Sequence, residues 1–175
     1  MKEISFFVPG KPQGKARART VRMPNGFTRS FTPDKTVLYE NLIKSCFMEA
    51  ESRHGSKFSL EAGTPVEMEL TACFKPPVSQ SLKKQKLMLL GEVQPLKKPD
   101  MDNIVKVVAD ALNGLAYHDD TQICVLTARK TYQSVEGLQV LIREYVPTVT
   151  VTDPASDVNA AVPGQIPGQI CLEIH

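Results

Sequence analysis

The residues with the clearest chemical potential are four aspartates and one lysine between positions 100 and 120. Asp100 and Asp102 flank a methionine, Lys106 follows four residues after Asp102, and Asp119 and Asp120 come after the next glycine. Carboxylates supply the oxygen ligands that a hard divalent cation takes, and a neighbouring ammonium favours phosphoryl oxygens. The set therefore indicates metal-assisted chemistry on a phosphate ester.

Each of these acids also has an ordinary structural explanation. Asp102 is a good helix N-cap, and an Asp-Asp pair before a strand is usual in a solvated turn. Two aspartates separated by one residue are common by chance. Only the combination of the acids with Lys106, around one apolar helix, favours a site.

The helix between the acids is readable from its period. Apolar residues recur at helical spacing from Ile104 to Leu115, Gly114 stands where a left-handed cap is expected, and Pro99 disfavours helix before it. The spacing predicts a helix over 103–113 with Asp102 as its N-cap. An extended segment before it would point the Asp100 and Asp102 carboxylates the same way.

A cationic loop near the N-terminus is the second candidate functional segment. It has no acid and five cations: Lys11, Lys15, Arg17, Arg19 and Arg22. A solvated loop and a phosphate clamp both fit this composition. Arg29, with Phe27 or Phe31, extends the surface on a hairpin predicted across 24–26, and Lys97 and Lys98 precede the central acids.

The remaining elements follow from apolar spacing. We expect strands at 4–8 and 66–74, a helix from Thr32 or Asp34 to about residue 54, and a short helix within 79–91. Residues 122–132 are apolar on both faces, which predicts an interior strand paired in an antiparallel hairpin with 138–145.

Composition favours one domain at 1–147 and a flexible tail at 148–175, with a short strand possible at its end or a role in binding another protein. The net charge of +2 conceals a body at +5, because the tail has three acids and neither Lys nor Arg. The four cysteines lack metal-ligand spacing, which favours reduced thiols in a cytoplasmic protein. No segment has the length of a membrane span or of a signal peptide.

These motifs resemble the core signature of the RusA family of Holliday-junction resolvases, in its prophage-type branch. The matching segments are Lys98-Pro99-Asp100-Met101-Asp102-Asn103, Lys106, Asp110-Ala111-Leu112-Asn113-Gly114 and Asp119-Asp120-Thr121-Gln122. The layout from Pro9 to Arg19 is also similar to the N-terminal segment of that branch. The resemblance covers the body and not the tail.

The resemblance implies an α+β fold, a small mixed sheet packed against two main helices, in a homodimer encoded by a bacterium or phage. It also implies paired symmetric nicks in four-way junction DNA. Mg²⁺, with Mn²⁺ as a possible substitute, would be held by Asp100, Asp102 and Asp120. Lys106 would stabilise developing charge, and Asp119 would contact the metal ligands and not the metal itself.

Two other functions remain open from the residues alone. The cationic loop would suffice for a non-catalytic junction- or duplex-binding protein, although a pure binder gains nothing from acids beside phosphates. A metal-dependent phosphotransferase or nucleotide-sugar transferase would use the same Asp-x-Asp pair. Such enzymes usually have an apolar strand leading into the pair, whereas Lys97-Lys98-Pro99 precedes it in this chain.

Overall fold

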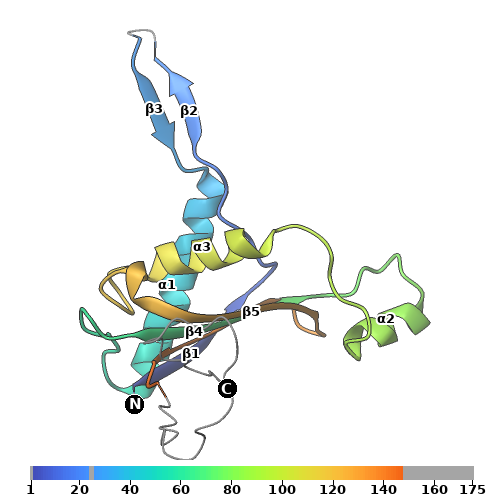
Figure 1. Cartoon of the computed structure of the whole chain (residues 1–175). Helices are drawn as coiled ribbons and strands as arrows, with labels where there is room; N and C mark the ends of the chain where they lie inside the picture. Colours follow the sequence, from blue (N-terminus) through green and yellow to red (C-terminus); the bar gives the residue numbers. More distant parts are fainter. Residues whose placement is uncertain (1, 24–25, 148–175) are drawn as a thin grey trace, which may run out of the picture. The chain divides into compact units, whose positions relative to one another are not determined.

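The computed structural model describes residues 2–23 and 26–147 (Figure 1). The elements are β1 (Glu3–Pro9), β2 (Arg19–Arg22), β3 (Thr28–Phe31), α1 (Asp34–His54), β4 (Val66–Phe74), α2 (Leu82–Leu89), α3 (Met101–Leu112), a 3-10 turn η1 (Asp120–Gln122), β5 (Ile123–Tyr132) and β6 (Gly137–Glu144). The compact body spans Met1–Tyr145. The strand expected near the end of the tail lies outside the described residues.

The main sheet is mixed and has the strand order β1-β6-β4-β5. β6 pairs antiparallel with both β1 and β4, whereas β4 and β5 run parallel. β2 and β3 form a separate antiparallel hairpin. The predicted α+β class, with a small mixed sheet and two main helices, is confirmed.

One face of the sheet carries the core. The register aligns Ile4 with Ile142 and Met68, and it aligns Phe6 with Val140. All five side chains are buried. The helices α1 and α3 contact each other, α1 contacts β1 and α3 contacts β5, so the two helices cover this face (Figure 1).

The opposite face of the sheet carries a cluster of charged residues around Arg143. Arg143 donates to both carboxylate oxygens of Glu67 at 2.8 Å and to Glu69 at 3.0 Å. These hydrogen bonds lower the pKa of the Glu67 carboxyl below its usual range, against the opposing effect of burial. Glu67 and Glu69 therefore lie away from the core, in alternation with the buried Val66, Met68 and Leu70.

The prediction for β5 was wrong in two respects. β5 is an edge strand and not an interior one, and β4 lies between β5 and β6, so these two strands form no hairpin. The four residues between Tyr132 and Gly137 carry the chain across the end of β4, where the Gln133 amide donates to the Phe74 carbonyl at 2.9 Å. Apolar alternation marks a strand but does not specify its neighbour.

No helix in the described part of the chain is long and apolar enough to cross a bilayer.

Gly137 should be intolerant of a side chain. A Cβ there would lie 2.0 Å from the Phe7 ring and 2.7 Å from the backbone oxygen of Val8. The ring can turn aside, but the backbone oxygen is fixed by the β1–β6 pairing. Gly137→Ala should lower the free energy of unfolding by about 1–3 kcal/mol, measured by urea denaturation. Gln139→Ala, at an exposed position on the same strand, is the control, and equal midpoints for the two variants would contradict the expectation.

Candidate active site and nucleic-acid interface

The helix α3 begins earlier than its sequence pattern predicted, and this changes the role of Asp102. The N-cap is Asp100, whose backbone is extended and whose side chain makes no capping hydrogen bond. Asp102 lies in the first helical turn and is exposed. Since residues after Asp100 are helical, the two carboxylates do not share a face through the alternation of a strand. The predicted start at Asn103 and the predicted cap at Asp102 are therefore wrong.

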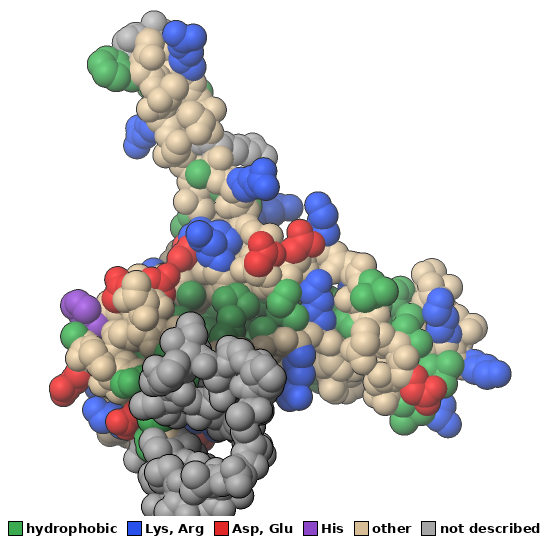
Figure 2. All heavy atoms as spheres, viewed as in Figure 1, with side chains coloured by type: hydrophobic (Ala, Val, Ile, Leu, Met, Phe, Trp, Pro, Cys, Tyr) green, Lys and Arg blue, Asp and Glu red, His purple; other side chains and the backbone are tan. Residues whose placement is uncertain are grey.

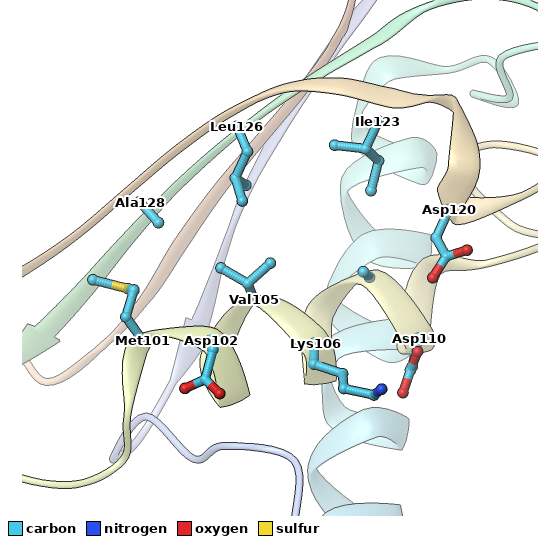
Figure 3. A pocket seen from close by; sticks show the side chains of 10 residues that line it. Met101, Asp102, Val105, Lys106, Asp110, Asp120, Ile123, Leu126 and Ala128 are labelled. Atoms are coloured by element: carbon cyan, nitrogen blue, oxygen red, sulfur yellow. The ribbon is translucent and has the colours of Figure 1, made fainter.

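Asp102 opens onto a hollow of about 660 Å³ between α3 and β5, which we call the acidic groove. Apolar side chains of α3 and β5 face each other across it (Figure 3): Met101, Val105, Ile123, Leu126 and Ala128. Ala109 of α3 also lines it. Asp102, Lys106, Asp110 and Asp120 complete the lining. In Figure 3, Lys106 lies between Asp102 and Asp110, and Asp120 lies on the side of Asp110. The groove thus combines three carboxylates with one ammonium.

Asp120 reaches this groove because the chain after α3 is fixed by a buried tyrosine and a capped turn. Tyr117 is fully buried and its hydroxyl donates to the Ala109 carbonyl at 2.9 Å. Asp119 caps the following turn, accepting from the Thr121 amide at 3.0 Å and the Thr121 hydroxyl at 2.6 Å. These hydrogen bonds lower the pKa of the Asp119 carboxyl. The structure therefore gives Asp119 a local capping role and leaves Asp120 exposed.

Asp100 lines a different hollow, of about 810 Å³, which we call the basic pocket. Four lysines line it together with Asp100: Lys11, Lys15, Lys35 and Lys98. The acidic groove and the basic pocket are therefore neighbours, since Asp100 and Asp102 belong to the same turn of chain. Lys35 is a cation that sequence reasoning missed. It stands in the first turn of α1, and no pattern in the sequence connects it with the acids.

The aspartates fit a divalent cation by donor type, although they do not form a preassembled site. Asp102, Asp110 and Asp120 offer the carboxylate oxygens that Mg²⁺ prefers, beside the apolar side chains of the groove. Among residues 2–23 and 26–147, however, no three acidic, histidine or cysteine side chains converge closely enough to hold an ion. The structure brings Asp102 and Asp120 to one hollow and places Asp100 in the next.

Lys15 is engaged in the protein and not free on the surface. Its ammonium forms ion pairs with Glu40 of α1 and with Asp110 of α3, the latter at 2.9 Å. Burial lowers the pKa of this amine, but the hydrogen bonds to the two carboxylates outweigh that effect and raise it above its usual 10.5. Much of the charge of Lys15 is thus balanced within the protein, and Asp110 has a structural partner.

The backbone beside Lys15 is also fastened to α3. The Lys15 amide donates to the Asn103 carbonyl at 2.8 Å. A Cβ at Gly14 would lie 2.8 Å from the Cβ of Asn103, so glycine is needed for this close approach. The loop from Lys11 to Lys15 is consequently a fixed wall of the basic pocket.

The other predicted phosphate-binding residues fall into two groups. Lys98 joins Lys11 in the basic pocket, but the Lys97 ammonium lies over the rings of Phe74 and Tyr132, at 5.1 and 5.8 Å from their centroids. Such contacts favour the cation and hold it against the sheet. The second group is the hairpin side of the loop: Arg17, Arg22 and Arg29 are exposed, and Arg19 begins β2.

Comparison with known proteins agrees with this geometry. Residues 9–143 match the family model described as endodeoxyribonuclease RusA. The chain is also similar to the Bacillus subtilis (strain 168) protein named "Uncharacterized protein YqaN", with 32% identity over 142 residues, which cover 81% of this chain and 96% of the relative. The matched region contains every residue of the acidic groove and of the basic pocket. The chain therefore belongs to the RusA endodeoxyribonuclease family.

Proposed function

We propose that the protein is a Mg²⁺-dependent endonuclease that resolves four-way DNA junctions by paired symmetric nicks. The observation that carries the proposal is the juxtaposition of the two hollows around the first turn of α3. The acidic groove holds Asp102, Asp120 and Lys106, and the basic pocket holds Lys11, Lys35 and Lys98. A phosphodiester strand needs both, carboxylates at the bond to be cleaved and cations along the flanking phosphates.

In this proposal Asp102 and Asp120 of the acidic groove, with Asp100 at the N-cap of α3, would hold the metal. Bound Mg²⁺, or Mn²⁺ in its place, would supply Lewis acidity and an activated water. The protein supplies the rest. The exposed Lys106 lies in the groove where the charge of a pentavalent phosphorus would develop, and its ammonium stabilises that charge.

The lysines of the basic pocket position the substrate. Lys11, Lys35 and Lys98 come from three separate segments, and no ion pair is found for them among the described residues. Their charges thus remain available for phosphate oxygens, in contrast to that of Lys15. Because Asp100 and Asp102 belong to one stretch of chain, a phosphate in the basic pocket would lie beside the acidic groove.

A homodimer completes the proposal, because one active site cuts one strand. A four-way junction has two-fold symmetry, and two identical subunits related by a two-fold axis would present their sites to opposed strands. One assay tests the whole proposal: a labelled mobile four-way junction, a linear duplex and a flap are incubated with the protein in Mg²⁺ or in EDTA. Symmetric nicks confined to the junction, and absent in EDTA, are expected. Binding without cleavage would instead identify a non-catalytic junction-binding protein.

Asp102→Asn should abolish cleavage while preserving DNA binding. The amide keeps the size of the side chain but removes the negative charge that favours a divalent cation, so the nicking rate should fall at least about a hundredfold. Affinity for the junction in EDTA should stay the same. Asp34→Asn removes another exposed acid, at the start of α1, and is the control. Full cleavage by Asp102→Asn would refute the assignment.

The cationic loop should account for a measurable share of the salt dependence of binding. Each phosphate contact contributes about 0.9 to the slope of log affinity against log salt concentration. The double variant Arg17→Ala and Arg19→Ala should therefore reduce that slope by about two, determined by fluorescence anisotropy at several salt concentrations. An unchanged slope would mean that neither arginine contacts phosphate.

Lys15→Met should affect stability and not the salt slope. The change leaves the Glu40 and Asp110 carboxylates without their shared partner and should lower the free energy of unfolding by about 1–3 kcal/mol. Because pairing raises the pKa of Lys15, this difference should persist through neutral pH and diminish only as the pH rises through that raised value, above 10.5. Lys11→Met, at an exposed position, should show the reverse: wild-type stability and a slope lower by about one.

A further inference from the structure

The β2–β3 hairpin has two unlike faces. Its register pairs Thr20 with Ser30 and Val21 with Arg29, and the Met23 amide donates to the Phe27 carbonyl at 2.7 Å in continuation of that register. Side chains alternate between the faces of a hairpin. One face is polar and includes a hydrogen bond of 2.9 Å between the Thr20 and Ser30 hydroxyls. The other, which we call the hairpin apolar face, carries Val21, Met23, Phe27, Arg29 and Phe31.

The hairpin apolar face is open to solvent. The exposed fractions are 74% for Phe27, 46% for Val21, 45% for Phe31 and 40% for Met23. The hairpin projects from the N-terminal end of α1, away from the main sheet (Figure 1). A two-stranded hairpin is marginal in water by itself, and a row of exposed large apolar side chains marks an interaction surface.

The charge around this face favours a polyanion as its partner. Residues 10–33 contain no Asp or Glu and contain six cations, of which Lys15 is paired with Glu40 and Asp110. The other five are Lys11, Arg17, Arg19, Arg22 and Arg29. Figure 2 shows Lys, Arg and hydrophobic side chains on the hairpin and no acidic ones on the side in view. Aromatic and apolar side chains interleaved with arginine are suited to DNA whose bases are unstacked, because base faces are apolar and backbones are anionic.

We propose that the hairpin apolar face contacts unstacked bases at the branch point of the junction, with Phe27 against a base. The inference rests on the proposed function and deepens it. The cations of the loop and of the basic pocket attract any DNA backbone and therefore do not distinguish a junction from a duplex. A continuous duplex hides its base faces, whereas a branch point interrupts stacking. The hairpin apolar face thus supplies a contact that only a junction, or another interrupted helix, can satisfy.

The test uses four-way junctions and linear duplexes with 2-aminopurine at the branch point or at the matching duplex position, in EDTA to prevent cleavage. Wild-type protein should change the fluorescence of the branch-point base and not that of the duplex base. Phe27→Ala should lose that change and bind the junction about tenfold more weakly, with duplex affinity within about twofold of wild type. Thr28→Ala, on the polar face of the hairpin, is the matched control, and Phe31→Ala is a second variant of the hairpin apolar face.

The outcomes separate this inference from the proposed function. Wild-type protein that does not prefer the junction would overturn the proposed function by itself. A junction preference that survives in both Phe27→Ala and Phe31→Ala, with an unchanged fluorescence response, would overturn the hairpin contact and leave the function standing. If Phe27→Ala or Phe31→Ala loses the mass of a dimer in light scattering but keeps the wild-type fluorescence response, a second copy of the chain covers this face. That result would also overturn the inference.

Discussion

The parallel pairing of β4 with β5 is the constraint on which the rest of the structure depends. Parallel neighbours cannot be joined by a tight turn, so the chain between Phe74 and Ile123 must return along the sheet. That return contains α3, and the turn after it delivers Asp120 to the start of β5. The acidic groove is the space between the returning helix and the strand that follows it. The chain topology therefore determines where the acids of this groove lie relative to one another, although these acids are near in sequence.

A second constraint fixes the N-terminal loop to the same helix. Gly14 allows the loop backbone to approach Asn103, and Lys15 joins Glu40 of α1 to Asp110 of α3 by ion pairs with side chains largely removed from water. One lysine thereby links three segments that are distant in sequence. This link fixes one wall of the basic pocket, and Lys11, Lys35 and Lys98 line the same pocket without an ion pair among the described residues. Lys15 thus links elements within the protein, whereas Lys11 of the same loop is exposed and is proposed to bind phosphate.

The protein combines a packed body with a hairpin that buries little. The sheet and its two helices hold the acids and the basic pocket in fixed positions, where small displacements would matter most for chemistry. The hairpin leaves large apolar side chains exposed, Val21, Met23 and Phe31 among them, and the proposed contact with bases uses that exposed surface. The edge strand β5 also leaves a large apolar side chain exposed, since Leu126 is 46% exposed beside the acidic groove.

The sequence by itself determined the existence and type of the elements, because the period of buried residues records which face of α1, β4 or α3 meets the core. It also identified the acids, Lys106 and the cationic loop by residue type. Only the tertiary structure decided that β4 separates β5 from β6 and that Asp100 and Asp102 open onto different hollows. It also showed that Lys15 and Lys97 make contacts within the protein, and that Lys35 and Lys98 line the same pocket. Those facts depend on strand order and on contacts between segments that are distant in sequence, and the local spacing of apolar residues specifies neither.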